Sequence, residues 1–376
     1  MTTEGGGPGS KAATHDHRAR LRRAAERGRH AGYAAVVVSP SPDLFYLTGY
    51  DAPVLERLTA LVLRDGKDPV LIVPELEAPR AAASGADSLT ELVPWRDGDD
   101  PIETLRSILS EGRIAVTERM WASQLLSLQR ALSSSTFEPA SSVLADLRAR
   151  KDPAEVQLLR KAARGADQSF SLITAEGFRG RMEGQVARSL AEHLQECGHD
   201  SVAFTSVGSG PNGASPHHLP EDRTIRAGDA VVMDFGGRVG GYCSDITRTV
   251  SVGEPRGEVA EVHAIVHEAQ EAAFGAAGPG VPGEEVDRAA RRVIEGAGYG
   301  HAFIHRTGHG IGLEEHEEPY LVEGNHRPLE PGNCFSIEPG IYLAGRFGVR
   351  IEDIVTLTED GAVRLNHAPR ELMVVA

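Results

Sequence analysis

Apolar and polar positions in the first 140 residues alternate between helix-like and strand-like segments. An arginine- and alanine-rich run from Thr14 to Gly32 is typical of a helix that ends at a glycine, and the apolar segment Ala34–Val38 is typical of a buried strand. Leu58–Arg64 and Pro69–Val73 flank the polar turn DGKD and predict a hairpin. We expect further helices over residues 74–84, 101–110 and 122–132, and further strands over 89–93 and 113–116. This order of elements predicts an α/β domain.

The periodicity breaks at SSSTFEPA, residues 133–140, which we interpret as a domain boundary. Beyond it, the pattern predicts helices up to residue 197, a sheet-like region over 202–252, a helix pair over 258–297 and strands between 303 and 357. The sequence therefore predicts a disordered Gly-, Ser- and Thr-rich tail at 1–15, an N-terminal α/β domain at 16–140 and an α+β domain at 141–376.

Composition and charge narrow the classes of partner. Of 376 residues, 54 are acidic and 39 are basic, and a net charge of −15 disfavours a nucleic-acid partner. No segment approaches the roughly 18 apolar residues that span a bilayer, and the N-terminus lacks the apolar core of a signal peptide, so we expect no membrane partner and a cytoplasmic protein. Three widely spaced cysteines without a CxxC pair fit a reducing compartment.

Two hairpins in the second domain place acid opposite acid. In DAVVMDFGGRVGGYCSDITRTVSV, a turn between Val239 and Gly240 sets Asp234 opposite Asp245, and opposed side chains lie about 4.5–5.5 Å apart at Cβ. In the second hairpin, a turn centred on Gly345 sets Glu338 opposite Glu352. The segments leading to Asp234 and Glu338 match at an offset of 104 residues, which predicts a domain of two related halves.

These acid pairs predict a metal site. A single carboxylate in a strand is most often solvated or ion-paired, but these four have apolar neighbours, and unpaired buried carboxylates are too costly to keep. Four carboxylates with a few imidazoles suit Mn²⁺, Co²⁺ or Zn²⁺. We take His309, flanked by glycines in HAFIHRTGHGIGLEEHEEP, as the nitrogen ligand. The loop SVGSGPNGASPHHLPED adds His217 and His218 shortly before Asp234.

Taken together, the motifs resemble the pita-bread-fold metallopeptidases, in particular the proline-directed branch of Xaa-Pro dipeptidases (prolidases) and Xaa-Pro aminopeptidases. The match covers roughly residues 200–370, and PSPDLFYLTGY resembles the smaller, creatinase-like first domain more loosely. The segments that carry the resemblance are Asp234, SDITRT with Asp245, TGHGIGLEEHEEP with His309, SIEPGIY with Glu338 and VRIED with Glu352.

The resemblance implies two divalent metal ions per chain, with manganese expected first and cobalt or zinc as alternatives. One ion would be chelated by Asp234 and the other held by His309 and Glu338, with Asp245 and Glu352 bridging both. A metal-bridging water or hydroxide would attack the peptide bond that precedes proline. Glu338 would pass the proton to the leaving nitrogen.

Further positions follow from the same resemblance. His217 matches a histidine near the leaving group, and His316 matches the one that stabilises the oxyanion. His305 and Arg350 match pocket positions, where Arg350 would orient a bridging carboxylate. The resemblance also favours a homodimer.

We expect hydrolysis of Xaa-Pro dipeptides, because the compact chain resembles prolidases more than the longer aminopeptidases. A dipeptidase must recognise the free carboxylate of the substrate, and Arg327 in EGNHRPLEPG is the available basic group, although it also fits a solvated loop arginine. The alternatives are an Xaa-Pro aminopeptidase that acts on longer peptides, a creatinase-like amidinohydrolase without metal, and a non-catalytic binding protein on the same scaffold.

Overall fold

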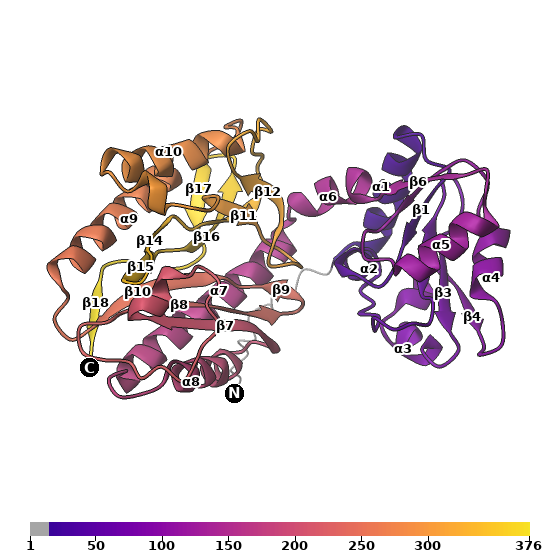
Figure 1. The fold of residues 1–376 in the computed structure, drawn as a ribbon. Helices are drawn as coiled ribbons and strands as arrows, with labels where there is room; N and C mark the ends of the chain where they lie inside the picture. The colour runs from indigo at the N-terminus through magenta and orange to yellow at the C-terminus, as the bar shows by residue number, and fades with distance from the viewer. Residues whose placement is uncertain (1–14) are drawn as a thin grey trace, which may run out of the picture. The chain divides into compact units, whose positions relative to one another are not determined.

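The computed structural model describes residues 15–376, so the predicted tail, apart from His15, lies outside the described residues. The described chain divides into two units, Asp16–Arg148 and Ala149–Ala376 (Figure 1). The division falls later than residue 140 because helix α6 (Ser141–Ala149) packs with the first unit, where the Tyr46 hydroxyl donates to the Leu147 carbonyl (3.0 Å). No helix of the described residues is long and apolar enough to cross a membrane.

A six-stranded sheet in the order β4-β3-β2-β1-β5-β6 organises the N-terminal unit. Its strands are β1 (Ala35–Val38), β2 (Ala60–Leu63), β3 (Val70–Pro74), β4 (Glu91–Trp95), β5 (Arg113–Val116) and β6 (Thr136–Pro139). Its other helices are α1 (His17–His30), α2 (Pro42–Thr48), α3 (Ala78–Ala83), the 3-10 turn η1 (Ala86–Ser88), α4 (Pro101–Ile108) and α5 (Ala122–Ala131). The predicted hairpin is confirmed as β2–β3, in which Leu61 pairs with Leu71.

The C-terminal unit repeats an order of two helices followed by strands. The first half holds α7 (Pro153–Glu176), α8 (Glu183–Glu196), β7 (Ser201–Ser209), η2 (Gly210–Ala214), β8 (Ala230–Val239), β9 (Tyr242–Cys243) and β10 (Ile246–Val252). The second half holds α9 (Gly257–Ala276), α10 (Gly283–Gly296), η3 (Gly300–Ala302), β11 (Gly308–Gly310), β12 (Glu317–Leu321), β13 (Cys334–Ile337), β14 (Gly340–Leu343), β15 (Phe347–Arg350), β16 (Asp353–Thr358) and β17 (Gly361–Arg364). A last strand, β18 (Met373–Val375), returns to pair with β10. The order fits the expected pair of related halves.

The strands of this unit lie between two pairs of helices, with α7 and α8 on one side and α9 and α10 on the other (Figure 1). They form the sheets β18-β10-β8-β7 and β12-β11-β13-β16-β17 and the ribbon β14-β15. One apolar core, which includes Phe170 and Met233, lies under α7 and α8, and another, which includes Val266 and Phe335, lies under α9 and α10. The strands that carry the candidate ligands are therefore held from both sides.

The first acidic hairpin has a register that the sequence did not predict. Asp234 pairs with Thr247, not with Asp245, because the turn centres on Gly240 and Gly241. These glycines have φ of 57° and 86°, and a two-residue hairpin turn with both central residues in the left-handed region favours glycine at each. The prediction that Asp234 lies opposite Asp245 is therefore wrong by two residues. A shift of two keeps both side chains on one face of the hairpin.

The register of the second hairpin is confirmed. Ile337 pairs with Asp353 in one ladder and Gly340 pairs with Arg350 in the next, which is the register that a turn at Gly345 predicts. Glu338 and Glu352 lie between these two ladders.

Candidate metal centre

A cavity of about 780 Å³ in the C-terminal unit collects nearly all the predicted site residues. Its lining includes His217, Asp234, Asp245, His305, His309, His316, Glu338, Arg350 and Glu352. The acids come from β8, from the residue before β10, from the residue after β13 and from the junction of β15 and β16, while His309 lies on β11. Residues up to 135 positions apart in the chain thus meet in one place.

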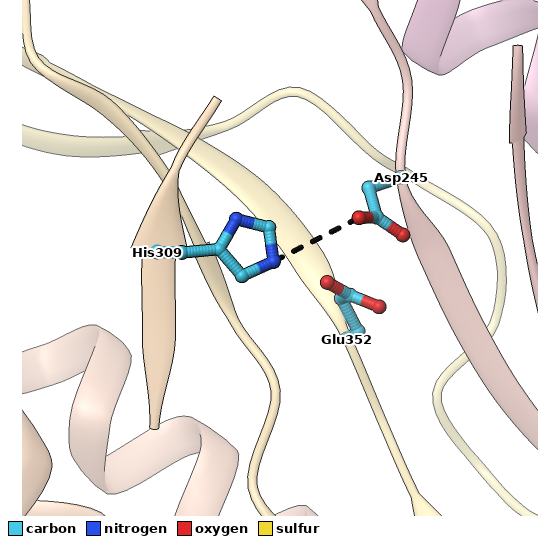
Figure 2. Close-up of side chains that lie close together, drawn as sticks. All are labelled: Asp245, His309 and Glu352. Carbon is cyan, nitrogen blue, oxygen red and sulfur yellow. Dashed lines mark ion pairs between the residues drawn. The ribbon is translucent and has the colours of Figure 1, made fainter. Parts of the chain in front are cut away.

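Three of these cavity-lining side chains form a compact group. Asp245, His309 and Glu352 each offer one ligand atom, and these atoms lie within 4.8 Å of one another (Figure 2). Nε2 of His309 is 3.8 Å from Oδ2 of Asp245 and 3.3 Å from Oε1 of Glu338. The arrangement has the spacing and the donor atoms of a cation site.

Unsatisfied oxygen atoms support this interpretation. Oδ1 of Asp234, Oδ1 of Asp245 and Oε1 of Glu352 are buried without a hydrogen-bond partner among the described residues, and no other carboxylate oxygen there shares that condition. Burying an acceptor without a partner costs free energy, and a bound cation removes that cost. The donor set therefore fits divalent metal.

The electrostatics of the cluster agree. Burial, and then the charges of neighbouring carboxylates, raise the pKa of Asp245 and of Glu352 above the ordinary values. Burial raises the pKa of Glu338 to about 7. Burial, together with the nearby His316, lowers the pKa of His309 to about 3, which leaves a neutral imidazole able to bind metal. Four clustered acids resist full ionisation unless positive charge joins them.

Arg350 makes hydrogen bonds to one acid of the cluster and to two neighbouring hydroxyl groups. Its guanidinium donates to Oδ2 of Asp234 (2.6 Å), to Oγ1 of Thr247 (2.9 Å) and to the Tyr342 hydroxyl (2.7 Å). The Thr247 hydroxyl in turn donates to Oε2 of Glu352 (2.7 Å). Arg350 thus contacts the expected chelating acid directly, and it reaches the expected bridging acid Glu352 only through Thr247.

The other predicted histidines surround the same space. The ring of His316 is 4.1 Å from that of His309, at an interplanar angle of 75°. Nε2 of His305 lies 2.9 Å from the Tyr342 hydroxyl, and burial lowers the pKa of His305 to about 4. The charge of His217 acts on the pKa of both His305 and His316, in keeping with its place in the cavity lining.

The predicted arginine, Arg327, does not line the cavity. Its loop is tied to the start of α10, where the amide of Gly283 donates to the Arg327 carbonyl (3.2 Å), and Arg327 is exposed. A different arginine, Arg306, lines the cavity with its guanidinium carbon 4.6 Å from the centre of the Tyr320 ring. Sequence reasoning missed Arg306, although it follows directly after His305 in the histidine-rich segment that was singled out.

Two family models match the chain. The model of metallopeptidase family M24 matches residues 157–359, and the creatinase/prolidase N-terminal domain matches residues 20–150. The chain belongs to metallopeptidase family M24. Its fold is accordingly the pita-bread fold, preceded by a creatinase-type N-terminal domain, as the sequence predicted.

Individual M24 relatives align over almost the whole chain. A probable dipeptidase, PepE, of Mycobacterium tuberculosis is 48% identical over 360 residues, which cover 95% of this chain and 96% of the relative. An Xaa-Pro dipeptidase of Lactobacillus delbrueckii is 35% identical, over 92% of this chain and 95% of the relative. The crystal structure of a prolidase from Thermococcus sibiricus superposes with a TM-score of 0.92 and 38% identity, over 96% of this chain and 100% of the other.

Proposed function

We propose that this M24 protein is an Xaa-Pro dipeptidase that uses two divalent metal ions. The observation that carries the proposal is the group of three buried carboxylate oxygens without a hydrogen-bond donor, in one cavity with the imidazole of His309. The three relatives named above support the choice of substrate, since they are described as a probable dipeptidase, an Xaa-Pro dipeptidase and a prolidase.

The residues that would hold the metals are Asp234, Asp245, His309, Glu338 and Glu352, and in this proposal Asp245 and Glu352 would serve both ions. When bound, the metals would supply a Lewis acid and lower the pKa of a bound water, which provides a nucleophile at neutral pH. Manganese is our first choice, because a donor set dominated by carboxylates suits a hard or borderline ion.

The chain's own groups have distinct tasks in this proposal. The carboxylate of Glu338 takes up a proton and passes it to the leaving nitrogen. His316 donates a hydrogen bond to the oxyanion that forms at the scissile carbonyl, and His217 contacts the leaving proline side. Arg350 holds Asp234 directly, and the Tyr342 hydroxyl links Arg350 to His305 in the pocket wall.

We further propose that Arg306, in place of Arg327, binds the free carboxylate of the dipeptide. No ion pair or hydrogen bond of the Arg306 guanidinium is found among the described residues, and that side chain lines the cavity. A guanidinium left without an anionic partner beside a substrate site is available for a charge-assisted contact.

The deciding experiment measures proline release from Ala-Pro by the purified protein, before and after exhaustive chelation and after Mn²⁺ is restored. We expect activity to vanish with chelation and to return with Mn²⁺. Full activity in protein shown by elemental analysis to be metal-free would contradict the proposal. Faster cleavage of Ala-Pro-Ala than of Ala-Pro would replace the dipeptidase by an Xaa-Pro aminopeptidase.

Two further expectations belong to the proposal. A homodimer is favoured by the family resemblance, and sedimentation of the purified protein tests it. A cytoplasmic location is favoured by the cysteine usage, and fractionation of cells that express the protein tests it.

A further inference from the structure

One carboxylate in the C-terminal unit is fully buried and yet has no place in the catalytic chemistry proposed above. Glu183 is the first residue of α8, and its exposed fraction is 0%. Its two oxygens accept hydrogen bonds from Ser209, Asn212, His218 and Glu221. So many donors on one buried carboxylate indicate that Glu183 fixes the position of the residues that donate to it, since each hydrogen bond offsets part of the cost of burying the charge.

The partners of Glu183 are Ser209, the last residue of β7, and residues of the loop that connects β7 to β8 and carries His217. At one end of the loop the amide and hydroxyl of Ser209 donate to Oε1 (2.7 and 2.6 Å). Towards the other end, Nε2 of His218 and the amide of Glu221 lie 2.8 and 3.3 Å from Oε2. The loop therefore closes around a single side chain.

The two adjacent histidines of this loop, His217 and His218, have different contacts. His218 turns to the buried carboxylate, and the exposed fraction of its side chain is only 11%. Its carbonyl also accepts a hydrogen bond from Ser206 (2.6 Å), so both its backbone and its ring are fixed. Both histidines line the cavity, but the ring of His218 is tied to Glu183, whereas the charge of His217, one peptide bond earlier, acts on His305 and His316. The position of His217 thus depends on the anchoring of His218.

We propose that Glu183 is a positioning residue, which holds His218 and thereby sets the place of His217 at the substrate. The proposal rests on the Xaa-Pro peptidase function only for the choice of assay. Although burial opposes its ionisation, hydrogen bonds from Ser209 and His218 hold the pKa of Glu183 below its ordinary value, so the anchor is charged near neutral pH.

The matched variants are Glu183→Gln and Glu284→Gln. In Glu183→Gln one acceptor oxygen becomes an NH₂ group that faces donors, which releases part of the loop without changing side-chain volume. Glu284 lies in the first turn of α10 in the second half, and it accepts from Nδ1 of His326 (2.8 Å), a histidine that is 78% exposed and does not line the cavity. It therefore controls for the loss of a buried carboxylate that holds a histidine.

We expect Glu183→Gln to lower kcat for Ala-Pro roughly tenfold to a hundredfold, the usual effect of a displaced catalytic group, while metal content stays that of the wild type. Glu284→Gln should stay within about threefold of the wild type. The double variant Glu183→Gln/His217→Ala should lose no more activity than His217→Ala alone, because both changes act through the same group. Losses that multiply in the double variant, or a loss below threefold for Glu183→Gln, would overturn the proposal.

Hydrogen exchange supplies a readout that does not depend on activity. Backbone amides between residues 209 and 221 should exchange faster in Glu183→Gln than in the wild type, and they should exchange at the wild-type rate in Glu284→Gln. Equal protection of these amides in both variants would overturn the anchoring. If the wild type fails to cleave Ala-Pro, the proposed function falls while this measurement still decides the anchor. Should Glu183→Gln fail to fold, His218→Gln, which keeps a donor for Glu183, must retain more activity than His218→Leu, and the reverse order refutes the proposal.

Discussion

At the scale of single residues, Glu352 shows how a ligand is prepared by its neighbours. The Thr247 hydroxyl holds Oε2 at 2.7 Å, and Oε1 is left buried without a donor. One oxygen thus fixes the orientation of the carboxylate, and the other is left without a protein donor. The same division applies to Asp234, whose Oδ2 is held by Arg350 while Oδ1 has no donor.

This preparation makes a charge-neutral substitution informative. Glu352→Gln keeps the shape and the contact with Thr247 but replaces an anion by a neutral amide, so we expect metal content to fall below that of the wild type and kcat to fall at least a hundredfold. Elemental analysis after dialysis measures the first and proline release the second. Glu315→Gln is the control, because Glu315 lines the cavity but pairs with Arg238 (2.6 Å). Full metal content in Glu352→Gln would show that this residue is no ligand.

Arg306 and Arg327 form a second matched pair. A charged hydrogen bond contributes about 1.5–3 kcal/mol, so loss of the carboxylate contact in Arg306→Ala should lower kcat/KM for Ala-Pro by about one to two orders of magnitude. Arg306→Ala should change little in the hydrolysis of Ala-Pro amide, a dipeptide whose C-terminus is amidated and carries no carboxylate. Arg327→Ala should behave as the wild type on both substrates. If Arg306→Ala weakens hydrolysis of the acid and the amide equally, the guanidinium does not recognise the carboxylate.

At the scale of elements, the two hairpins show what the sequence determines. The turn at Gly345 was predicted correctly because the apolar alternation on both sides leaves one register that buries the same face. The first hairpin offers two glycine pairs. A Cβ at Gly236 would come within 2.0 Å of the Ser244 carbonyl, so that pair serves close packing and leaves the turn to Gly240 and Gly241. No local pattern distinguishes these two uses of glycine.

Other features were not predicted from the sequence because a local pattern allows more than one structure or does not show distant partners. The segment SPSPD, residues 39–43, has the composition of a turn, but Ser41 accepts from the amide of Leu44 and Pro42 occupies the first turn, which starts helix α2. Four of the expected ligands stand out in the sequence because they are acids among apolar strand residues, and His309 stands out because glycines flank it. Arg306 and Glu183 were missed because their importance comes from partners, or the lack of them, that lie far away in the chain.

Helix α9 contributes a pH dependence that is independent of the metal site. Burial, together with the charges of His267 and Arg248, lowers the pKa of His263 to about 4, whereas Glu371 acts in the opposite direction. Below pH 6.5, His263 therefore binds a proton in the unfolded chain but stays neutral in the folded chain. The free energy of unfolding consequently falls as pH decreases towards 4. Between pH 7 and pH 5 we expect a loss of about 2 kcal/mol from this group.

The test compares urea midpoints of the wild type and His263→Leu at pH 7 and pH 5, in excess chelator so that metal loss does not contribute. The variant should lose less stability on acidification than the wild type. The variant His267→Leu removes a neighbouring charge that lowers the pKa of His263, so its dependence on pH should lie between those of the wild type and His263→Leu. Parallel losses in the wild type and His263→Leu would contradict the assignment.

At the scale of the whole molecule, metal binding should stabilise the two units unequally. All proposed ligands lie in Ala149–Ala376, whereas both tryptophans, Trp95 and Trp121, lie in Asp16–Arg148. A metal at a hundred times its Kd stabilises the unit that binds it by about 2.7 kcal/mol, which corresponds to a Tm shift of roughly 5–10 °C for a unit of this size. We expect Mn²⁺ to raise the transition followed by far-ultraviolet circular dichroism and to leave the tryptophan fluorescence transition unchanged. Equal shifts in both signals would show that the units unfold together, and no shift in either would show that Mn²⁺ does not bind the folded state.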